Sequence, residues 1–199
     1  MIPLGERFGQ ALIYAFELHK RQERKGNLTP YIAHPLGVCA LVLEDGGDED
    51  EAIAALLHDA AEDQGGLKTL EEIRRRFGEQ VAAIVDGCTD TYETPKPAWR
   101  GRKEAYLEHL LSAEPAVVRV SLADKLHNAR AILTDLYCHG DQLWERFNGG
   151  KAGSLWYYRS LVEIFKELYS HDAKPTPMVA LLDEAVKQIE RISSEDGEL

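Results

Sequence analysis

Residues 52–63 read AIAALLHDAAED, so four polar side chains directly follow an apolar run. His58 and Glu62 are four residues apart and share a face if the run is helical, and the same holds for Asp59 and Asp63. A solvated, acidic helix end is the common explanation of such a pattern, and it suits Glu62 and Asp63. It does not suit His58, which follows the apolar residues without a break. Adjacent histidine and aspartate in an apolar helix are natural ligands for a divalent metal ion.

Apolar residues recur at helical spacing through most of the remaining chain. The pattern predicts an all-α fold of about ten helices in a single domain over residues 1–199, with helices over 150–193 packing on the part before them. One helix is expected to run from the acidic residues 48–51 through Ala61. A capping box at Thr69 and Glu72 is expected to open the next helix.

Composition limits the classes of partner. The chain has 199 residues and a formal net charge of -11, from 34 acidic and 23 basic residues. That sign argues against nucleic-acid polymers and anionic membranes, but not against a small phosphorylated ligand met by local cations or a metal. Three separated cysteines without a CxxC pair indicate reduced thiols. Neither a signal peptide nor an apolar stretch of roughly 18 residues is evident, so a cytoplasmic protein is expected.

Two further candidate ligands lie at a distance in sequence. His34 immediately precedes Pro35 at an expected helix start, and Asp124 lies within an expected buried helix. Taken singly, His34 suits a structural histidine and Asp124 suits a surface charge. The face that carries Asp124 and Asn128 lies opposite a leucine stripe, and it could meet solvent or a polar pocket.

Basic residues form two clusters in this acidic chain. Lys20, Arg21, Arg24 and Lys25 form the denser one, which also suits the last turn of a solvated helix. Arg100, Arg102 and Lys103 form the second, a weaker candidate for contacts to 5′-phosphates. The aromatic segment around Trp156 is typical of a packed helix, with an active-site wall as the alternative.

Together these residues resemble the H…HD…D signature of the HD superfamily of phosphohydrolases. His58 follows His34 by 24 residues, and Asp124 follows Asp59 by 65. The surrounding sequence motifs make the resemblance more specific, because they are similar to those in the hydrolase domain of RelA/SpoT-type (p)ppGpp hydrolases, particularly the stand-alone small alarmone hydrolases. These short motifs are HKRQERK at 19–25, PYIAHP at 30–35, ALLHDAAED at 55–63, FG at 77–78 and LADKLHN at 122–128. The resemblance covers roughly residues 5–136.

The resemblance implies a site and a reaction. One divalent ion, typically Mn²⁺, is expected to be held by His34, His58, Asp59 and Asp124. Glu62 and Asp63 correspond to the catalytic acidic pair, and the residues expected to contact the nucleotide are Arg24, Lys25 and Asn128. The implied enzyme removes the 3′-diphosphate of (p)ppGpp, which gives GDP or GTP and pyrophosphate. No residue after 136 corresponds to a synthetase, so hydrolysis alone is expected.

Alternatives remain open at this level. The same metal residues would serve a phosphohydrolase that acts on an adenosine alarmone, NADPH or a nucleoside monophosphate. A degenerate module that only binds an alarmone or a partner would have no need of Glu62 and Asp63. An oligomer is possible, since nothing in the sequence sets the oligomeric state.

Overall fold

The computed structural model describes residues 3–26, 28–170 and 176–195. Among these residues the structure is α-helical, with one 3-10 helix, no β-strand and an isolated bridge between Glu23 and Pro30. The all-α fold class expected from the sequence is confirmed. Within the described part of the chain, no helix combines the length and the apolar character that crossing a bilayer requires.

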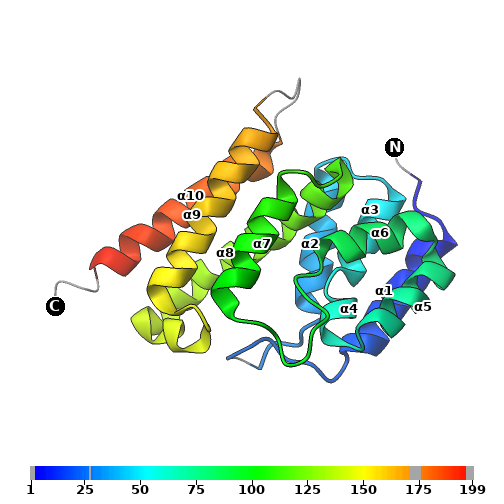
Figure 1. The fold of residues 1–199 in the computed structure, drawn as a ribbon, viewed down its shortest axis with the longest axis horizontal. Helices are drawn as coiled ribbons and strands as arrows, with labels where there is room; N and C mark the ends of the chain where they lie inside the picture. Colours follow the sequence, from blue (N-terminus) through cyan, green and yellow to red (C-terminus); the bar gives the residue numbers. More distant parts are fainter. Residues whose placement is uncertain (1–2, 27, 171–175, 196–199) are drawn as a thin grey trace. The chain divides into compact units, whose positions relative to one another are not determined.

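The chain divides into two compact units, Met1–Lys96 with Ala113–Asp124, and Pro97–Ser112 with Lys125–Leu199. The first unit contains α1 (Glu6–His19), α2 (Ala33–Glu44), α3 (Glu49–Leu57), α4 (Ala60–Asp63), α5 (Leu67–Phe77), α6 (Glu79–Cys88) and the start of α8 (Pro115–His139) (Figure 1). The second contains α7 (Trp99–Leu110), the rest of α8, the 3-10 helix η1 (Gly140–Arg146), α9 (Gly150–Leu168) and α10 (Pro177–Glu195). The expectation of a single domain stays a prediction.

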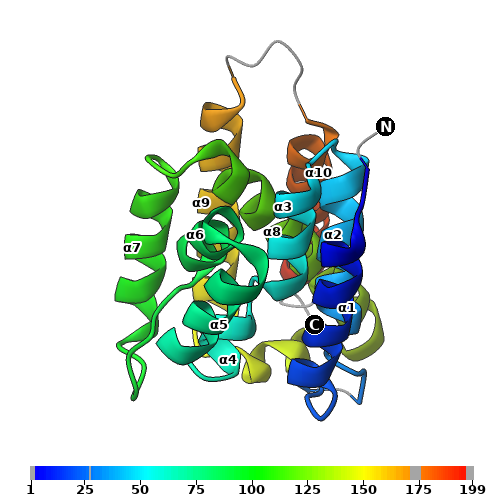
Figure 2. The ribbon, with the colours of Figure 1, turned by 90° about the vertical axis from the view of Figure 1, so that its right-hand side faces the viewer.

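Helix α3 is the centre of the first unit. It packs against α1, α2 and α6, and Figure 2 shows it beside α1 and α2. Every residue of 52–57 has a fully buried side chain, and the three alanines among them let neighbouring helices approach closely. Asp48 and Glu51 form a capping box that satisfies the first backbone N–H groups of the helix. The apolar run of the motif is therefore the most buried segment of the unit.

The expected continuous helix through Ala61 is wrong, because α3 ends at Leu57 and α4 begins at Ala60. His58 and Asp59 lie in the turn between them. The Nδ1 atom of His58 lies 2.8 Å from the carbonyl oxygen of Ala55, the acceptor that a continuous helix would offer to the N–H of Asp59. A side-chain hydrogen bond thus competes with the helical ladder where the polar residues begin.

The helix starts differ from the prediction at one more place. Helix α5 begins at Leu67, after Gly66 with φ 65°, and no side chain caps it. Thr69, the expected cap, is buried, and its hydroxyl donates 2.8 Å to the carbonyl of Gln64. The positive φ at Gly66 suits glycine and turns the chain into α5 without a capping side chain.

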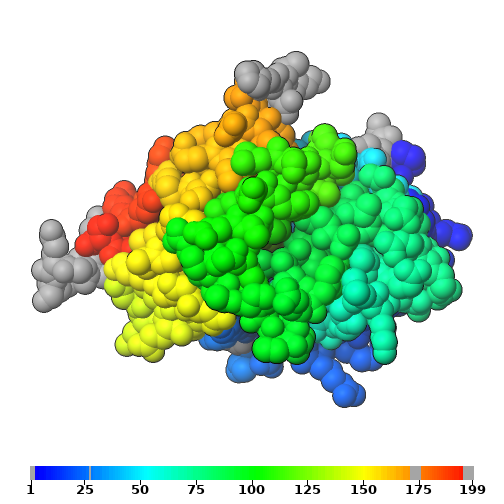
Figure 3. All heavy atoms as spheres, in the orientation of Figure 1, coloured from blue at the N-terminus to red at the C-terminus, as the bar shows by residue number. Residues whose placement is uncertain are grey.

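In the second unit, an indole fixes the packing of α7 on α9. The ring of Trp99 covers Gly149 and Gly153, and a Cβ atom added at Gly149 would lie 2.6 Å from that ring. Tyr157 is buried beside it, with ring centroids 6.2 Å apart. The space-filling view shows the atoms of α7, in green, abutting those of α9 (Figure 3). Packing explains much of the aromatic segment.

Arg119 ties the start of α8 to the turn between α2 and α3. Its Nε lies 3.1 Å from Asp45 Oδ2, and its Nη1 pairs with Glu51. The two carboxylate side chains are only 7% and 8% exposed. One guanidinium therefore pairs with two buried carboxylates.

Arg119→Met should lower the free energy of unfolding by about 3 kcal/mol, because it leaves both carboxylates buried without their cation. Urea denaturation measures this loss. Arg75→Met, which breaks an exposed pair with Glu72, is the matched control and should cost less than about 1 kcal/mol. Equal losses in the two variants would contradict the structural role given to Arg119.

Candidate metal centre and acidic pair

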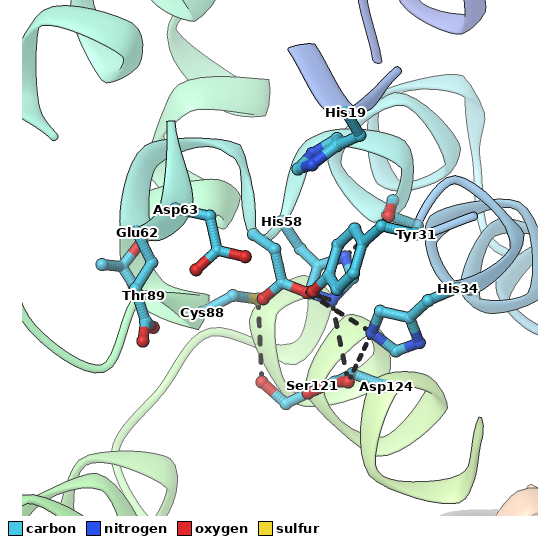
Figure 4. Close-up of polar contacts among 12 residues, drawn as sticks. His19, Tyr31, His34, His58, Glu62, Asp63, Cys88, Thr89, Ser121 and Asp124 are labelled. Carbon is cyan, nitrogen blue, oxygen red and sulfur yellow. Dashed lines mark hydrogen bonds and ion pairs between the residues drawn. The ribbon is translucent and has the colours of Figure 1, made fainter. Parts of the chain in front are cut away.

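Four side chains from three segments converge in the first unit (Figure 4). His34 Nε2 lies 3.1 Å from Asp124 Oδ1 and 3.4 Å from Asp59 Oδ2. His58 Nε2 lies 3.0 Å from Asp59 Oδ2 and 3.7 Å from Asp124 Oδ1. The structure thus brings together two imidazoles and two carboxylates, the four residues that the sequence analysis assigned to a metal.

Burial distinguishes this cluster from a surface group of charges. His34 is 1% exposed, His58 2% and Asp124 6%. The alternative of Asp124 as a surface charge is therefore wrong, because its buried side chain lies against His34 and His58 in the first unit. Polar atoms held this far from water need partners, which are hydrogen-bonding groups or an ion.

The orientation of His58 suits a cation. Its Nδ1 is engaged by the carbonyl of Ala55, which fixes the proton on that nitrogen in the neutral ring. Its Nε2 is buried and makes no hydrogen bond. A lone pair is therefore directed toward the two carboxylates, where His34, His58 and Asp59 have ligand atoms within 4.8 Å of one another.

The cluster favours positive charge. Burial opposes the charged form of His58, but the carboxylates of Asp59 and Asp124 outweigh it and raise the pKa of this imidazole well above its ordinary value. Burial also disfavours the charged form of Asp59, yet His58 and His34 hold its pKa well below the ordinary value. A proton on His58 and a metal ion are therefore competing ways to neutralise the same carboxylates.

Tyr31 supports Asp59 from the loop that precedes α2. Its hydroxyl donates 2.5 Å to Asp59 Oδ2, and burial together with Asp59 raises the pKa of this phenol. Its ring lies between those of His19 and His34, at centroid distances of 5.0 and 5.7 Å. Tyr31 thus orients a carboxylate and packs against a neighbouring imidazole.

The acidic pair lies in α4, one turn beyond Asp59. Glu62 accepts hydrogen bonds from the backbone N–H of Asp90 at 3.1 Å and from the Lys96 ammonium at 2.6 Å. Asp63 is at the exposed rim of the site and accepts a hydrogen bond of 2.8 Å from Gln22 Nε2. Partial loss of water and the nearby charge of Asp59 raise the pKa of the Asp63 carboxyl.

The expected nucleotide contacts have different surroundings. Arg24 and Lys25 lie in a loop closed by two backbone hydrogen bonds, from Arg24 N to Thr29 O at 2.9 Å and from Tyr31 N to Gln22 O at 2.8 Å. Asn128 is half-buried in α8 and belongs to the second unit. The contacts of these three residues with a substrate stay predictions.

In the second cluster of basic residues, two side chains lie against aromatic rings. The guanidinium of Arg100 lies 3.2 Å from the Trp156 ring centroid, and the Lys103 ammonium lies 5.2 Å from that of Tyr157. The ring contacts account for part of this cluster without a phosphate.

Sequence reasoning gave no role to four residues that contact or border the site: His19, Gln22, Tyr31 and Lys96. Three of them, His19, Gln22 and Tyr31, lie in the sequence stretches that carried the resemblance, and this position was the signal that could have found them. Lys96 gave no signal, because only the folded chain brings it to Glu62.

The model of the HD domain family matches residues 11–153. A guanosine-3′,5′-bis(diphosphate) 3′-pyrophosphohydrolase, MESH1 of Xenopus tropicalis, is 44% identical over 124 residues, which cover 61% of this chain and 66% of the relative. A pyrophosphohydrolase of the same description from Aquifex aeolicus is 37% identical over 128 residues, covering 64% of this chain and 18% of the relative. The chain thus matches just under two thirds of the first relative and less than a fifth of the second.

A solved structure shows the same fold. It is described as a metazoan orthologue of SpoT that hydrolyses ppGpp and plays a role in starvation responses. It superposes with a TM-score of 0.73 at 25% identity, covering 94% of this chain and 98% of that one.

The charge pair of His58 and Asp59 predicts how the stability of metal-free protein depends on pH. The raised pKa of His58 stabilises the fold below the ordinary value of 6.5, and this contribution is lost as the pH rises through the folded-state pKa. The lowered pKa of Asp59 stabilises the fold above the ordinary value of 3.8, and that contribution is lost as the pH falls through its folded-state pKa.

In chelator-treated protein, the Tm difference between the wild type and Asp59→Asn should therefore be largest between these two ordinary values. It should shrink once the pH rises far enough to deprotonate His58. Thermal melts across the pH range measure it, and a difference that grows steadily toward alkaline pH would contradict the assigned charges.

Proposed function

The chain belongs to the HD domain family, and we propose that it is a metal-dependent (p)ppGpp 3′-pyrophosphohydrolase. The reaction adds water to the 3′-diphosphate and releases pyrophosphate together with GDP or GTP. The observation that carries this proposal is the convergence of three buried side chains and the partly exposed Asp59 beside the acidic pair of α4; the buried three are His34, His58 and Asp124. The relatives that carry this activity in their names support the choice of substrate.

The four converging residues would hold one divalent ion, and Mn²⁺ is the ion we propose. The buried Nε2 of His58, which faces the carboxylates of Asp59 and Asp124, fits a metal ligand, and two imidazoles with two carboxylates are a mixed N/O donor set suited to such an ion. When bound, the ion supplies Lewis acidity and lowers the pKa of water. Tyr31, through its hydrogen bond to Asp59 Oδ2, keeps that carboxylate in place.

The acidic pair activates and positions the attacking water. A carboxylate oxygen of Glu62 or Asp63 takes the proton of that water, which requires hydrogen-bond reach to it. Lys96 and the N–H of Asp90 hold Glu62, and Gln22 holds Asp63, so both carboxylates are oriented before a substrate arrives. Two oriented carboxylates are more than a module that only binds a nucleotide needs.

Arg24 and Lys25 are the residues we propose for phosphate contacts, with Asn128 near the ribose. A local pair of cations offsets the acidic net charge of the chain where a highly charged nucleotide must approach. The partner is thus a small nucleotide, with no nucleic-acid polymer and no membrane. The cytoplasm is the proposed compartment, in keeping with three cysteines that form no disulfide.

A nucleotide panel tests the proposal. Purified protein with Mn²⁺ is given ppGpp, pppGpp, the adenosine alarmones, NADPH and nucleoside monophosphates, and released pyrophosphate and orthophosphate are measured separately. Pyrophosphate from ppGpp supports the proposal. Orthophosphate from NADPH without pyrophosphate from ppGpp would overturn it in favour of another substrate, and tight ppGpp binding without turnover would favour a binding module.

Two substitutions should separate metal binding from chemistry. Asp59→Asn should lose both the bound metal and the activity, because it removes a charged ligand from the cluster. Glu62→Gln should keep the metal and slow hydrolysis by roughly 10²- to 10⁴-fold if Glu62 is the general base. Metal content per chain and initial rates, determined on the same samples, check both expectations. Full metal occupancy in Asp59→Asn would contradict the ligand set, and an unchanged rate in Glu62→Gln would assign the proton transfer to Asp63.

A further inference from the structure

The side chain of Gln22 lies at the centre of a small hydrogen-bond network beside the acidic pair. Its Oε1 lies 2.7 Å from His19 Nδ1 and accepts a bond of 2.6 Å from Gln64 Nε2. Its Nε2 donates 2.8 Å to Asp63 Oδ2. One amide therefore links the end of α1 to both residues at the end of α4.

The network fixes which way the Gln22 amide faces. The Asp63 carboxylate accepts hydrogen bonds and donates none, so the Gln22 NH₂ group faces it, and Gln22 Oε1 accepts from His19 Nδ1, which then carries the proton. With a second donor from Gln64 on the same oxygen, the NH₂ group is left to face Asp63. If the Gln22 amide were flipped, its NH₂ group would face the donors of His19 and Gln64, and its oxygen would face the Asp63 carboxylate.

Asp63 needs such a partner because its own backbone gives it little support. Helix α4 has four residues, and Gln64 after it has left the helical region, with φ -127° and ψ 31°. The carboxylate lies at the exposed rim, and among the described residues Gln22 is the one side chain that hydrogen-bonds to it. Without that bond, no side-chain hydrogen bond among the described residues holds the Asp63 rotamer.

We propose that Gln22 is a positioning residue, which holds the Asp63 carboxylate toward the metal cluster and is itself locked by His19 and Gln64. The inference rests on the proposed function, since positioning matters only if Asp63 takes part in hydrolysis. The end of α1 and the turn after it then support two of the four carboxylates of the site. Gln22 holds Asp63 directly, and His19 packs on Tyr31, which holds Asp59.

Two variants remove the donor in different ways. Gln22→Ala deletes the amide, whereas the backbone bonds of Gln22 to His19 and Tyr31 remain possible. Gln22→Glu keeps an acceptor for His19 and Gln64 but places a carboxylate against Asp63. Gln10→Glu adds the same charge at an exposed position of α1 and is the matched control.

Both Gln22 variants should lower kcat for ppGpp by about 10- to 100-fold, the usual cost of removing an outer hydrogen-bond partner. KM should stay within about threefold of the wild type, because a positioning residue does not hold the substrate. Metal content and Tm should stay near those of Gln10→Glu. An unchanged kcat, or a loss confined to KM, would overturn the inference.

A second readout needs no turnover. In ¹⁵N-labelled, metal-free protein, the side-chain NH₂ signal of Gln22 is assigned by its loss in Gln22→Glu. Asp63→Asn should shift that signal and leave the NH₂ signal of Gln10 in place. A Gln22 signal that ignores Asp63→Asn would overturn the inference even if the enzyme is active. Wild-type protein that hydrolyses nothing, but shows the shift, would overturn the proposed function while supporting the contact.

Discussion

The hydrogen bond between His58 Nδ1 and the carbonyl of Ala55 is the interaction on which the site depends. Its acceptor lies in the last turn of α3, whose residues 52–57 are fully buried. The imidazole is therefore attached to the packed core of the first unit. The hydrogen bond lies where α3 ends, and the two-residue turn that follows carries Asp59 beside the imidazole before α4 begins at Ala60. One side-chain bond thus orients the imidazole at the point where the buried helix gives way to the polar residues.

Charge then follows from this geometry. Two carboxylates held near two imidazoles at low exposure create a place where a cation is strongly favoured, either a proton on His58 or a metal ion. The aromatic ring of Tyr31 closes one side and donates to Asp59. Glu62 and Asp63 lie outside this cluster and are held by other donors, Glu62 by Lys96 and the N–H of Asp90 and Asp63 by Gln22.

The spacing of apolar residues predicted the all-α class, and the resemblance to the HD superfamily predicted the shared site of His34, His58, Asp59 and Asp124. Sequence reasoning failed where local and tertiary effects compete. The continuous helix through Ala61 was wrong because the pattern of apolar residues does not reveal a side chain that takes a helical acceptor. The capping box was expected at Thr69 and is found at Asp48, since a glycine with positive φ can start α5 without a capping side chain. Gln22 and Lys96 could not be paired with their carboxylates, because those contacts span more than 30 residues.

The complete burial of residues 52–57 in α3 has a consequence for hydrogen exchange of the backbone amides. Backbone amides in such a segment exchange with solvent mainly through global unfolding, whereas amides in exposed loops exchange through small local openings. His58 is attached to the slow-exchanging side of the site, and Arg24 and Lys25 are attached to a loop closed by a few bonds. Amide hydrogens of residues 52–57 should therefore exchange far more slowly than those of Arg24 and Lys25 in that loop.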